Sequence, residues 1–301
     1  MALPATQGYG DITPADVAAI TDTVISTAEV LRPQFTVMER LVTRSPIPRG
    51  TNQIDVPYQE SIFTPGDLPD GEEISTVQDF KVGTVPLTPT RLHITYRIDE
   101  RAQRFSLEDI AVMAGRELAR SQGQRFETDL LALTDDTGVQ DAGGSGGDIT
   151  IVFLRTAKRM LLINAVEYGG PAPEPIYCVI GPHQEFDLQT DLGAISVVAS
   201  TTPWIPHGLS EDLIKQYGVS GSALAGVPIF RSGYLNDTNH GTTGGTMFAK
   251  VGLILAVSKE WSVRVFEESN WPGPIIRSIG DYGVSLGPFP RWVVDLDCDV
   301  E

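Results

Sequence analysis

The segment from residue 49 to residue 98 constrains the fold more than any other part of the sequence. Apolar residues alternate with polar ones over 54–58 and again over 92–98, which is the period of a half-buried strand. Turn-forming residues fill 64–71 between the two runs. The pattern predicts a long two-stranded arm. Because an isolated two-stranded ribbon is marginally stable and leaves hydrogen-bonding edges open, this arm must lie on a neighbour.

The arm and the segment after it carry opposite charges. Residues 55–79 hold seven acidic residues and no lysine or arginine, whereas residues 91–125 hold seven arginines against five acids. Since the arm cannot easily fold back on its own root, this division predicts a contact between subunits; two separately solvated faces are the alternative. The acidic candidates for the contact are Asp55, Glu60, Asp67, Asp70, Glu72, Glu73 and Asp79. The basic candidates are Arg91, Arg97, Arg101, Arg104, Arg116, Arg120 and Arg125.

Two helices are expected in the first half of the chain. Pro14 follows a threonine that can cap a helix, apolar residues recur at helical spacing, and Pro33 is expected to end this helix. A longer helix is predicted over 106–134, where it would span ~40 Å and act as a rigid spine. Gly115 and Gly123 are expected to weaken this helix or to bend it slightly.

The second half of the chain has a mixed pattern. A glycine-rich loop at 143–147 leads to Asp148, a candidate helix cap, and to a helix predicted over about 149–167. Short helices are expected to alternate with strands after this helix. The predicted strands are 176–180, 227–231, 247–257, 261–267 and 291–296.

Charge and composition disfavour several classes of protein. The chain has 22 lysines and arginines against 39 acidic residues, and its net charge of −17 disfavours a nucleic-acid reader or a partner of anionic membranes. Its 301 residues suggest about two domains, or one large one. Two cysteines cannot form a disulfide framework, so a reducing compartment is expected. No apolar run approaches the ~20 residues of a membrane span, and the first residues do not resemble a secretory signal.

Two serines lie in G-x-S-x-G patterns, which in hydrolases present a nucleophile at a strand-to-helix turn. Ser145 is followed by three histidines that could serve as its base, His183, His207 and His240, whereas no histidine follows Ser285. Because a helix end and a loop precede Ser145, rather than a buried strand, a linker role is preferred to catalysis.

Three carboxylates near the end of the chain, at Asp295, Asp297 and Asp299, are expected on one face of a strand. They lack the glycine and the distal glutamate of a calcium loop, so a solvated strand face is preferred to a metal site. The glycine-rich loop lacks the residues of known phosphate-binding loops. We therefore predict no catalytic residue, no metal and no cofactor.

Three stretches of the sequence together resemble a known family. Residues 88–100 alternate and lead into the long helix, residues 220–230 contain the pattern L-x-G-x-P, and an apolar run at 249–256 precedes a second strand at 261–267. They look like the returning strand of the E-loop, the axial-domain segment and the late pair of strands of the major capsid protein of tailed phages. The chain therefore resembles the Hong Kong 97 type of capsid protein over most of its length from about residue 30.

The resemblance implies an α+β fold with an N-terminal arm, an extended β-hairpin called the E-loop, a spine helix in a peripheral domain, and a mixed α/β axial domain. The implied boundaries are 1–48 for the N-terminal arm, 49–98 for the E-loop, 99–170 for the peripheral domain, 171–250 for the axial domain and 251–301 for the late strands.

The resemblance also implies a function. Hexamers and pentamers of the chain would close an icosahedral capsid around double-stranded DNA, which they would contact only non-specifically, and no membrane would be involved. A scaffolding protein, a portal and a decoration protein are the implied partners. The chain would be assembled in the host cytoplasm and located in the virion. An encapsulin-like compartment shell is the alternative, and a serine hydrolase using Ser145 is the second alternative.

Overall fold

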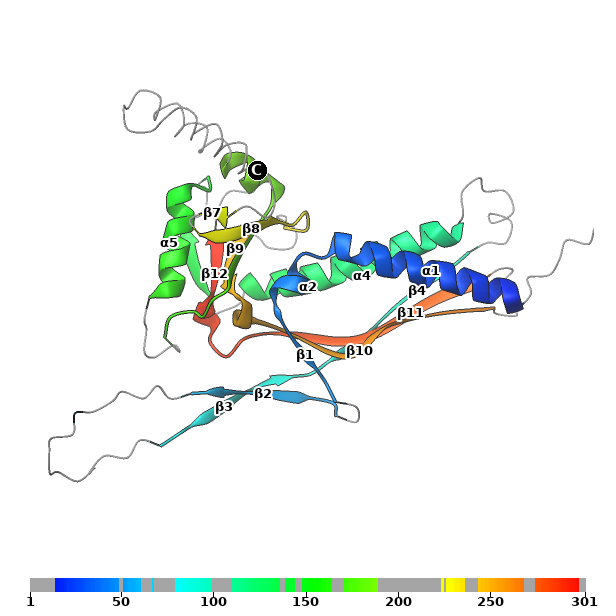
Figure 1. Ribbon diagram of the computed structural model, residues 1–301, viewed down its shortest axis with the longest axis horizontal. Coiled ribbons are helices and arrows are strands. Elements are labelled where there is room, and N and C mark those ends of the chain that lie inside the picture. Colours follow the sequence, from blue (N-terminus) through cyan, green and yellow to red (C-terminus); the bar gives the residue numbers. More distant parts are fainter. Residues whose placement is uncertain are drawn as a thin grey trace, which may run out of the picture. The chain divides into compact units, whose positions relative to one another are not determined.

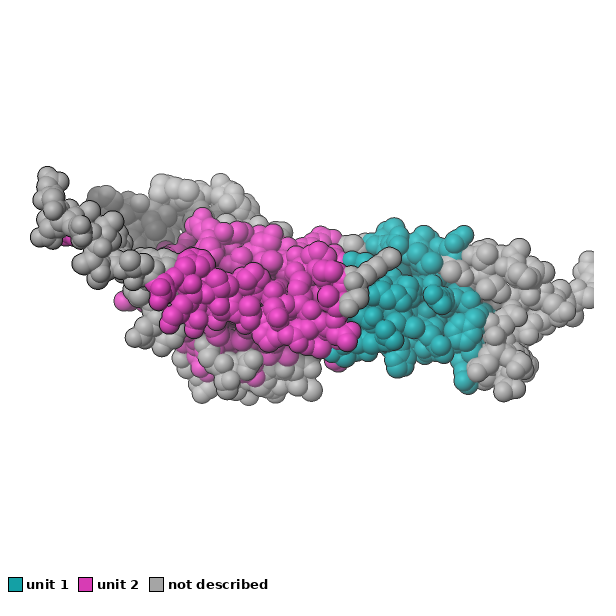
Figure 2. Space-filling model, turned by 90° about the horizontal axis from the view of Figure 1, so that it is seen from below, with its two compact units in different colours: residues 1–36, 90–124, 259–282 teal, residues 37–89, 125–258, 283–301 magenta. Residues whose placement is uncertain are grey.

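The protein is described by a computed structural model that divides into two compact units (Figure 2). Unit 1 comprises Met1–Thr36, Thr90–Gln124 and Lys259–Tyr282, and unit 2 comprises Val37–Pro89, Arg125–Ser258 and Gly283–Glu301. Within these units the structure describes residues 14–48, 51–60, 67, 79–98, 110–135, 139–143, 148–163, 170–188, 223–224, 226–235, 243–267 and 274–297.

Unit 1 is built from two helices and parts of a twisted sheet. Helix α1 (Pro14–Phe35) lies alongside the first part of α4 (Ile110–Ala132), as Figure 1 shows. Strand β4 (Thr90–Arg97) pairs antiparallel with β11 (Pro274–Leu286), which neighbours β10 (Leu253–Glu267). The alternation predicted around residues 92–98 is thus a real strand, and its partner is β11.

The core of unit 1 depends on small residues of α4. Gly115 lies against α1 so closely that a Cβ atom there would be 2.8 Å from the Cβ of Thr27 and 2.9 Å from the carbonyl oxygen of Val24. The glycine expected to weaken the helix therefore permits close helix packing. The buried apolar residues of this core are Val24, Ala28, Ile98, Ala111, Ala114, Leu118, Ala119 and Ile276.

The two long helices lie where they were predicted, although the expected start of the second one, at residue 106, falls outside the described residues. Helix α1 begins at Pro14 as expected but continues past Pro33 to Phe35, after which the hydroxyl of Thr36 donates to the carbonyl of Arg32. The predicted spine helix is found as α4, followed by one 3-10 turn, η1 (Leu133–Asp135). The 23 residues of α4 correspond to about 35 Å of helix.

Unit 2 contains a six-stranded mixed sheet with the order β5-β12-β9-β6-β8-β7. Helix α5 (Ile151–Leu162) packs on β5, β12 and β9. Its start is capped by Thr150, whose hydroxyl accepts the N–H of Phe153 at 3.3 Å, so Asp148 is not the cap that the sequence suggested. The strands are β5 (Gln140–Gly143), β12 (Val293–Asp297), β9 (Thr243–Ala249), β6 (Ile176–Ile180), β8 (Val227–Arg231) and β7 (Ala223–Leu224).

A second group of elements in unit 2 supports a two-stranded ribbon. Helix α2 (Met38–Leu41) leads into β1 (Thr43–Pro46), which pairs in parallel with the first residues of β10. The strand predicted over 247–257 is interrupted by a 3-10 turn, η3 (Lys250–Gly252), and a similar turn, η4 (Pro290–Trp292), precedes β12.

Candidate functional site

The ribbon consists of β2 (Ile54–Gln59) and β3 (Val82–Leu87), paired antiparallel with Ile54 opposite Leu87 and Gln59 opposite Val82. The predicted arm exists, but its second strand is not the predicted one. Residues 92–98 pair with β11 instead. Strand β3 was missed because glycine, threonine and proline interrupt its apolar alternation.

The inner face of the ribbon is fixed to the chain's own core. Leu87 is buried in a cluster with Ile47, Ile254 and Ala256, and the side chain of Val56 packs against it. Because side chains alternate between the faces of a strand, the opposite face of the ribbon is left outward.

Aromatic rings hold the middle of the ribbon. The ring of Tyr58 lies across Gly83, where a Cβ atom would be 2.5 Å from the Cζ of Tyr58. The same ring meets Phe289 edge-on at 5.5 Å between centroids, and Phe289 lies 4.7 Å from Trp292. The indole N–H of Trp292 donates to the carbonyl of Gly170 at 3.3 Å. We call Tyr58, Phe289 and Trp292 the aromatic clasp.

The distal end of the ribbon is exposed and amphipathic. Phe80 is 63% exposed and Val82 is 55% exposed. Two large apolar side chains therefore face solvent at neighbouring positions of the chain, which is unusual on a protein surface. Glu60 and Asp79 are exposed beside them, and the N–H of Glu60 donates to the carbonyl of Lys81 at 3.0 Å. The predicted acids Asp55 and Asp67 are exposed too, while Asp70, Glu72 and Glu73 lie outside the described residues.

Several of the predicted basic residues have acidic partners within the chain. Arg91 pairs with Asp281 at 3.0 Å, and this hydrogen bond raises the pKa of the guanidinium. Arg125 pairs with Asp129 at 3.0 Å. Arg97 and Arg116 are exposed, and Arg101 and Arg104 lie outside the described residues.

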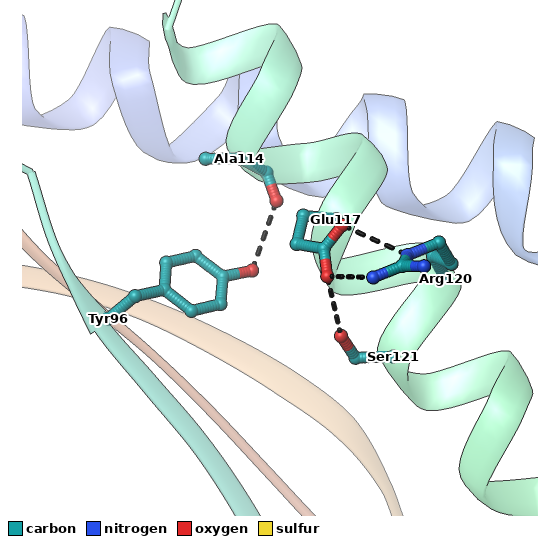
Figure 3. Close-up of polar contacts among 5 residues, drawn as sticks. All are labelled: Tyr96, Ala114, Glu117, Arg120 and Ser121. Atoms are coloured by element: carbon teal, nitrogen blue, oxygen red, sulfur yellow. Dashed lines mark hydrogen bonds and ion pairs between the residues drawn. The ribbon is translucent and has the colours of Figure 1, made fainter.

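Arg120 is also paired, as Figure 3 shows. Two of its nitrogens donate to the carboxylate of Glu117 at 2.8 and 3.0 Å, and the hydroxyl of Ser121 donates to it at 3.4 Å. The hydrogen bonds from Arg120 lower the pKa of Glu117. Nearby, the hydroxyl of Tyr96 donates to the carbonyl of Ala114 at 3.0 Å, and burial raises the pKa of Tyr96.

No protein-family model matches this sequence, and no curated protein has a significantly similar sequence. Three solved structures are similar to the chain along nearly its whole length. The capsid structure of cyanophage P-SCSP1u has a TM-score of 0.64 at 14% identity, covering 88% of this chain and 89% of that chain. A structure from Mycobacterium phage Che8 has a TM-score of 0.63 at 16% identity, covering 87% and 91%. A virus-like particle from Pyrococcus furiosus has a TM-score of 0.56 at 10% identity, covering 93% and 98%.

The chain has the Hong Kong 97-like fold of tailed-phage capsid proteins. Its α+β character was predicted correctly from the sequence. The correspondence between the ribbon and the E-loop of that fold is still a prediction. The boundaries of the N-terminal arm, the peripheral domain and the axial domain are predictions too.

In this Hong Kong 97-like chain a buried carboxylate that the sequence did not single out supports the ribbon's base. The carboxylate of Glu127 accepts the backbone N–H groups of Val37 and Met38 at 3.1 and 3.0 Å, which fixes the start of α2. Burial raises the pKa of Glu127, and these hydrogen bonds oppose the rise. Since α2 leads directly into β1, Glu127 positions the segment that carries Ile47.

The expected solvated face of the last strand is wrong for Asp295. This residue is only 4% exposed, and it stands opposite Asp141 of β5 and Thr246 of β9. Burial, followed by repulsion from Asp135, Asp141 and Asp297, raises the pKa of Asp295 to about 8. Among the described residues, no group of three histidine, cysteine or acidic side chains is arranged to hold a metal ion.

The two G-x-S-x-G patterns have different outcomes. Ser285 lies near the end of β11 and donates to the carbonyl of Leu286, with no strand-to-helix turn, and a Cβ atom at Gly283 would be 2.8 Å from the carbonyl oxygen of Thr88. Its glycines therefore serve close backbone packing. Ser145, His207 and His240 lie outside the described residues, and His183 is exposed. No helix in the described part of the chain is long and apolar enough to cross a membrane.

Proposed function

We propose that this chain is the structural subunit of an icosahedral viral capsid, in which hexamers and pentamers of many copies enclose double-stranded DNA. The observation that carries the proposal is the Hong Kong 97-like fold, shared over 88% of this chain with 89% of the cyanophage capsid protein. A fold alone does not fix a function, and here the exposed distal ribbon adds an element suited to contact between copies.

The ribbon supports self-association on physical grounds. Its base is buried against Ile47 and β10, whereas its distal end exposes Phe80 and Val82 beside acidic groups. A ribbon that extends from a fixed base and presents apolar and charged groups is suited to bind a neighbouring copy. Its acids would meet basic side chains of that copy, and among the predicted arginines that the structure describes, Arg97 and Arg116 are exposed.

The net charge supports the remaining partners of the proposal. A shell of −17 per subunit repels the phosphates of DNA on average, so packaged DNA would touch it only non-specifically and could slide during packing. A scaffolding protein, a portal and a decoration protein are further proposed partners. Assembly would take place in the host cytoplasm and the product would be the virion.

An encapsulin-like compartment shell is a second candidate. The similarity to the Pyrococcus furiosus virus-like particle, covering 98% of that chain, supports a shell of this general kind. The phage capsid structures have the higher TM-scores, 0.64 and 0.63 against 0.56, so the viral capsid is preferred.

The test is whether the purified chain forms shells and whether the distal ribbon is needed for them. Sedimentation and negative-stain microscopy should show large closed particles. Replacing residues 61–79 by a short glycine-serine turn, which keeps β2 and β3, should leave a folded chain that no longer closes shells. A wild-type chain that stays monomeric with a scaffolding partner supplied would contradict the proposal.

A further inference from the structure

Helix α5 is covered by the sheet on one side and exposed on the other. Leu154, Ala157 and Leu161 are buried against the six-stranded sheet, and Figure 1 shows the helix lying along one side of that sheet. Arg155 and Arg159, one helical turn apart, are exposed on the other side. Because burial of the inner side fixes the helix, these two guanidinium groups are presented from a fixed support.

All the charged residues of α5 are basic. A shallow hollow of about 440 Å³ is lined by Arg155, Lys158, Arg159, Leu162 and Ile163. A Cβ atom at Gly226 would be 3.1 Å from the Nζ of Lys158, so this lysine reaches toward the turn between β7 and β8. We call Arg155, Lys158 and Arg159 the α5 patch.

The two arginines of the α5 patch have no counter-ion in the part of the chain that the structure describes. In contrast, arginines of β1, β4, α4 and β8 each have an acidic partner in their own chain. The whole chain carries 39 acidic residues against 22 bases, so cations without a nearby acid are exceptional in it. This arrangement favours an anionic binding partner.

Duplex DNA has the charge that the α5 patch would bind. DNA carries one phosphate charge per ~1.7 Å of its axis, and Arg155 and Arg159 are separated by about 6 Å along α5, so each guanidinium can reach a phosphate. Guanidinium groups bind phosphate oxygens through two parallel hydrogen bonds. We propose that the α5 patch is the surface through which each copy touches the DNA that the shell encloses. This inference rests on the proposed function, and it adds that the side of the sheet bearing α5 faces the DNA.

The net charge of −17 does not oppose a contact at this one place. At physiological ionic strength the Debye length is about 8 Å, so a phosphate at the α5 patch interacts mainly with the charges beside it. The acid that precedes the helix, Asp148, lies before its first turn. The other acidic surfaces repel DNA, which keeps the contact weak and lets the DNA slide. A weak contact suffices, because a closed shell holds its DNA at high local concentration.

An acidic peptide is the other occupant that the α5 patch could take. Leu162 is 43% exposed and Ile163 is 50% exposed at the end of the helix, and both could pack on apolar side chains of such a peptide. We favour DNA because cations outnumber apolar residues around the hollow. A few exposed apolar residues are normal on a protein surface.

The first test measures binding of a short fluorescent DNA duplex to the unassembled full chain by anisotropy. Arg155→Gln with Arg159→Gln should weaken binding about tenfold at low salt. It should also reduce the slope of log affinity against log salt by about 2, because two phosphate contacts are lost. The matched control, Lys259→Gln with Arg264→Gln, removes the same charge from exposed positions of β10 and should change neither quantity.

Two results of this test would overturn the inference. Equal losses in both variants would mean that only the overall charge matters. Tighter binding of poly-L-glutamate than of the duplex, lost in the α5 variant, would mean that the α5 patch takes an acidic peptide instead.

The second test asks whether the α5 patch faces DNA in the assembled shell. DNA-filled and empty particles are treated with phenylglyoxal, which modifies accessible arginines, and the modified residues are mapped by mass spectrometry. Arg155 and Arg159 should react about fivefold less in filled particles than in empty ones, whereas Arg264 should react equally in both. Equal reactivity of Arg155 and Arg159 in the two kinds of particle would overturn the inference. Lack of reaction in both kinds would mean that another copy covers the α5 patch, which would overturn it too.

The outcomes separate this inference from the proposed function. If the wild-type chain forms closed particles and the α5 variant binds the duplex as well as wild type does, the α5 patch is not the DNA contact and the capsid proposal stands. If the chain binds the duplex through the α5 patch but never forms particles, the capsid proposal is wrong, and so is the claim that the bound DNA is enclosed.

Discussion

Helices α4 and α5 both carry arginines, yet the two helices use them differently. On α4, Arg120 is held by Glu117 and Arg125 by Asp129, one turn away in each case. On α5, no acid lies within the helix to hold Arg155 or Arg159. The local excess of arginine that marked 91–125 in the sequence is therefore partly neutralised at short range, whereas Arg155 and Arg159 have no acid within their own helix. Whether an arginine can bind another molecule depends more on the acids next to it than on how many arginines the segment contains.

The largest expected effect concerns a buried acid of unit 2, the unit that also contains α5. Burial raises the pKa of Asp295 to about 8 from 3.8, so its protonated form is favoured in the folded state. The contribution of Asp295 to the free energy of unfolding is therefore most favourable below about pH 4, where the carboxyl is protonated in both states. It is lost as the pH rises through about 8. The free energy of unfolding should therefore fall over that range by as much as roughly 6 kcal/mol from the ionisation of this group.

Asp295→Asn cannot ionise and should remove that part of the pH dependence. Denaturant unfolding at pH 5 and pH 8 measures it, with Asp55→Asn as an exposed control. Equal pH slopes in wild type and Asp295→Asn would mean that burial does not raise the pKa of Asp295 in the folded state.

A second expected effect tests how tightly each helix is covered. Gly115→Ala on α4 should destabilise unit 1 by about 1–3 kcal/mol, because the new methyl group meets Thr27 and Val24 of α1. In an exposed helix the same change would stabilise by ~1 kcal/mol. Thr156→Ala, at an exposed position of α5, should stay within about 0.5 kcal/mol of wild type. Denaturation midpoints decide both, and a stabilising Gly115→Ala would show that α1 does not pack there.

A third, smaller effect separates charges that serve folding from charges that serve contact. Glu117→Gln should lower the free energy of unfolding by at most about 1 kcal/mol, since the pair with Arg120 is exposed to solvent. Arg159→Gln should leave stability unchanged. Thermal melts at low and high salt measure the difference, which should shrink as salt is added. A clear loss of stability in Arg159→Gln would reveal an acidic partner for α5 within the chain.

The smallest expected effect concerns the arginines first suggested by the sequence. Arg116→Glu should lower the rate of particle formation by less than about threefold, and only at low ionic strength, where repulsion is weakly screened. Light scattering during assembly at two salt concentrations measures this. A larger loss, or one that persists at high salt, would contradict this minor role of Arg116 in assembly.

Strong periodicity made part of the fold predictable. The long helix, the strands at 176–180 and 227–231, and the arm itself follow from alternation and helical spacing. The pairing partner of residues 92–98 did not, because β11 lies about 180 residues away and nothing local selects between it and β2. Of the predicted acidic contacts, Asp55, Glu60, Asp67 and Asp79 are exposed in the single chain, and their contact with another subunit is still a prediction.

The rest of the candidate site depends on contacts that no local pattern reveals. The ion pair between Arg91 and Asp281 joins two strands far apart in the sequence. The burial of Asp295 follows from having β5 on one side and β9 on the other, whereas its own strand reads as half polar. The acid-free face of α5 could have been found from the sequence, since Val152, Arg155 and Arg159 share one helical face.

The aromatic clasp has a consequence for the order of events in the cell. Tyr58, at the middle of the ribbon, is steadied by Phe289, a residue made some 230 positions later in synthesis. While the chain is still on the ribosome, β2 and β3 therefore lack the ring of Phe289, against which Tyr58 packs in the folded protein. The ribbon therefore reaches its final position only when translation is nearly finished.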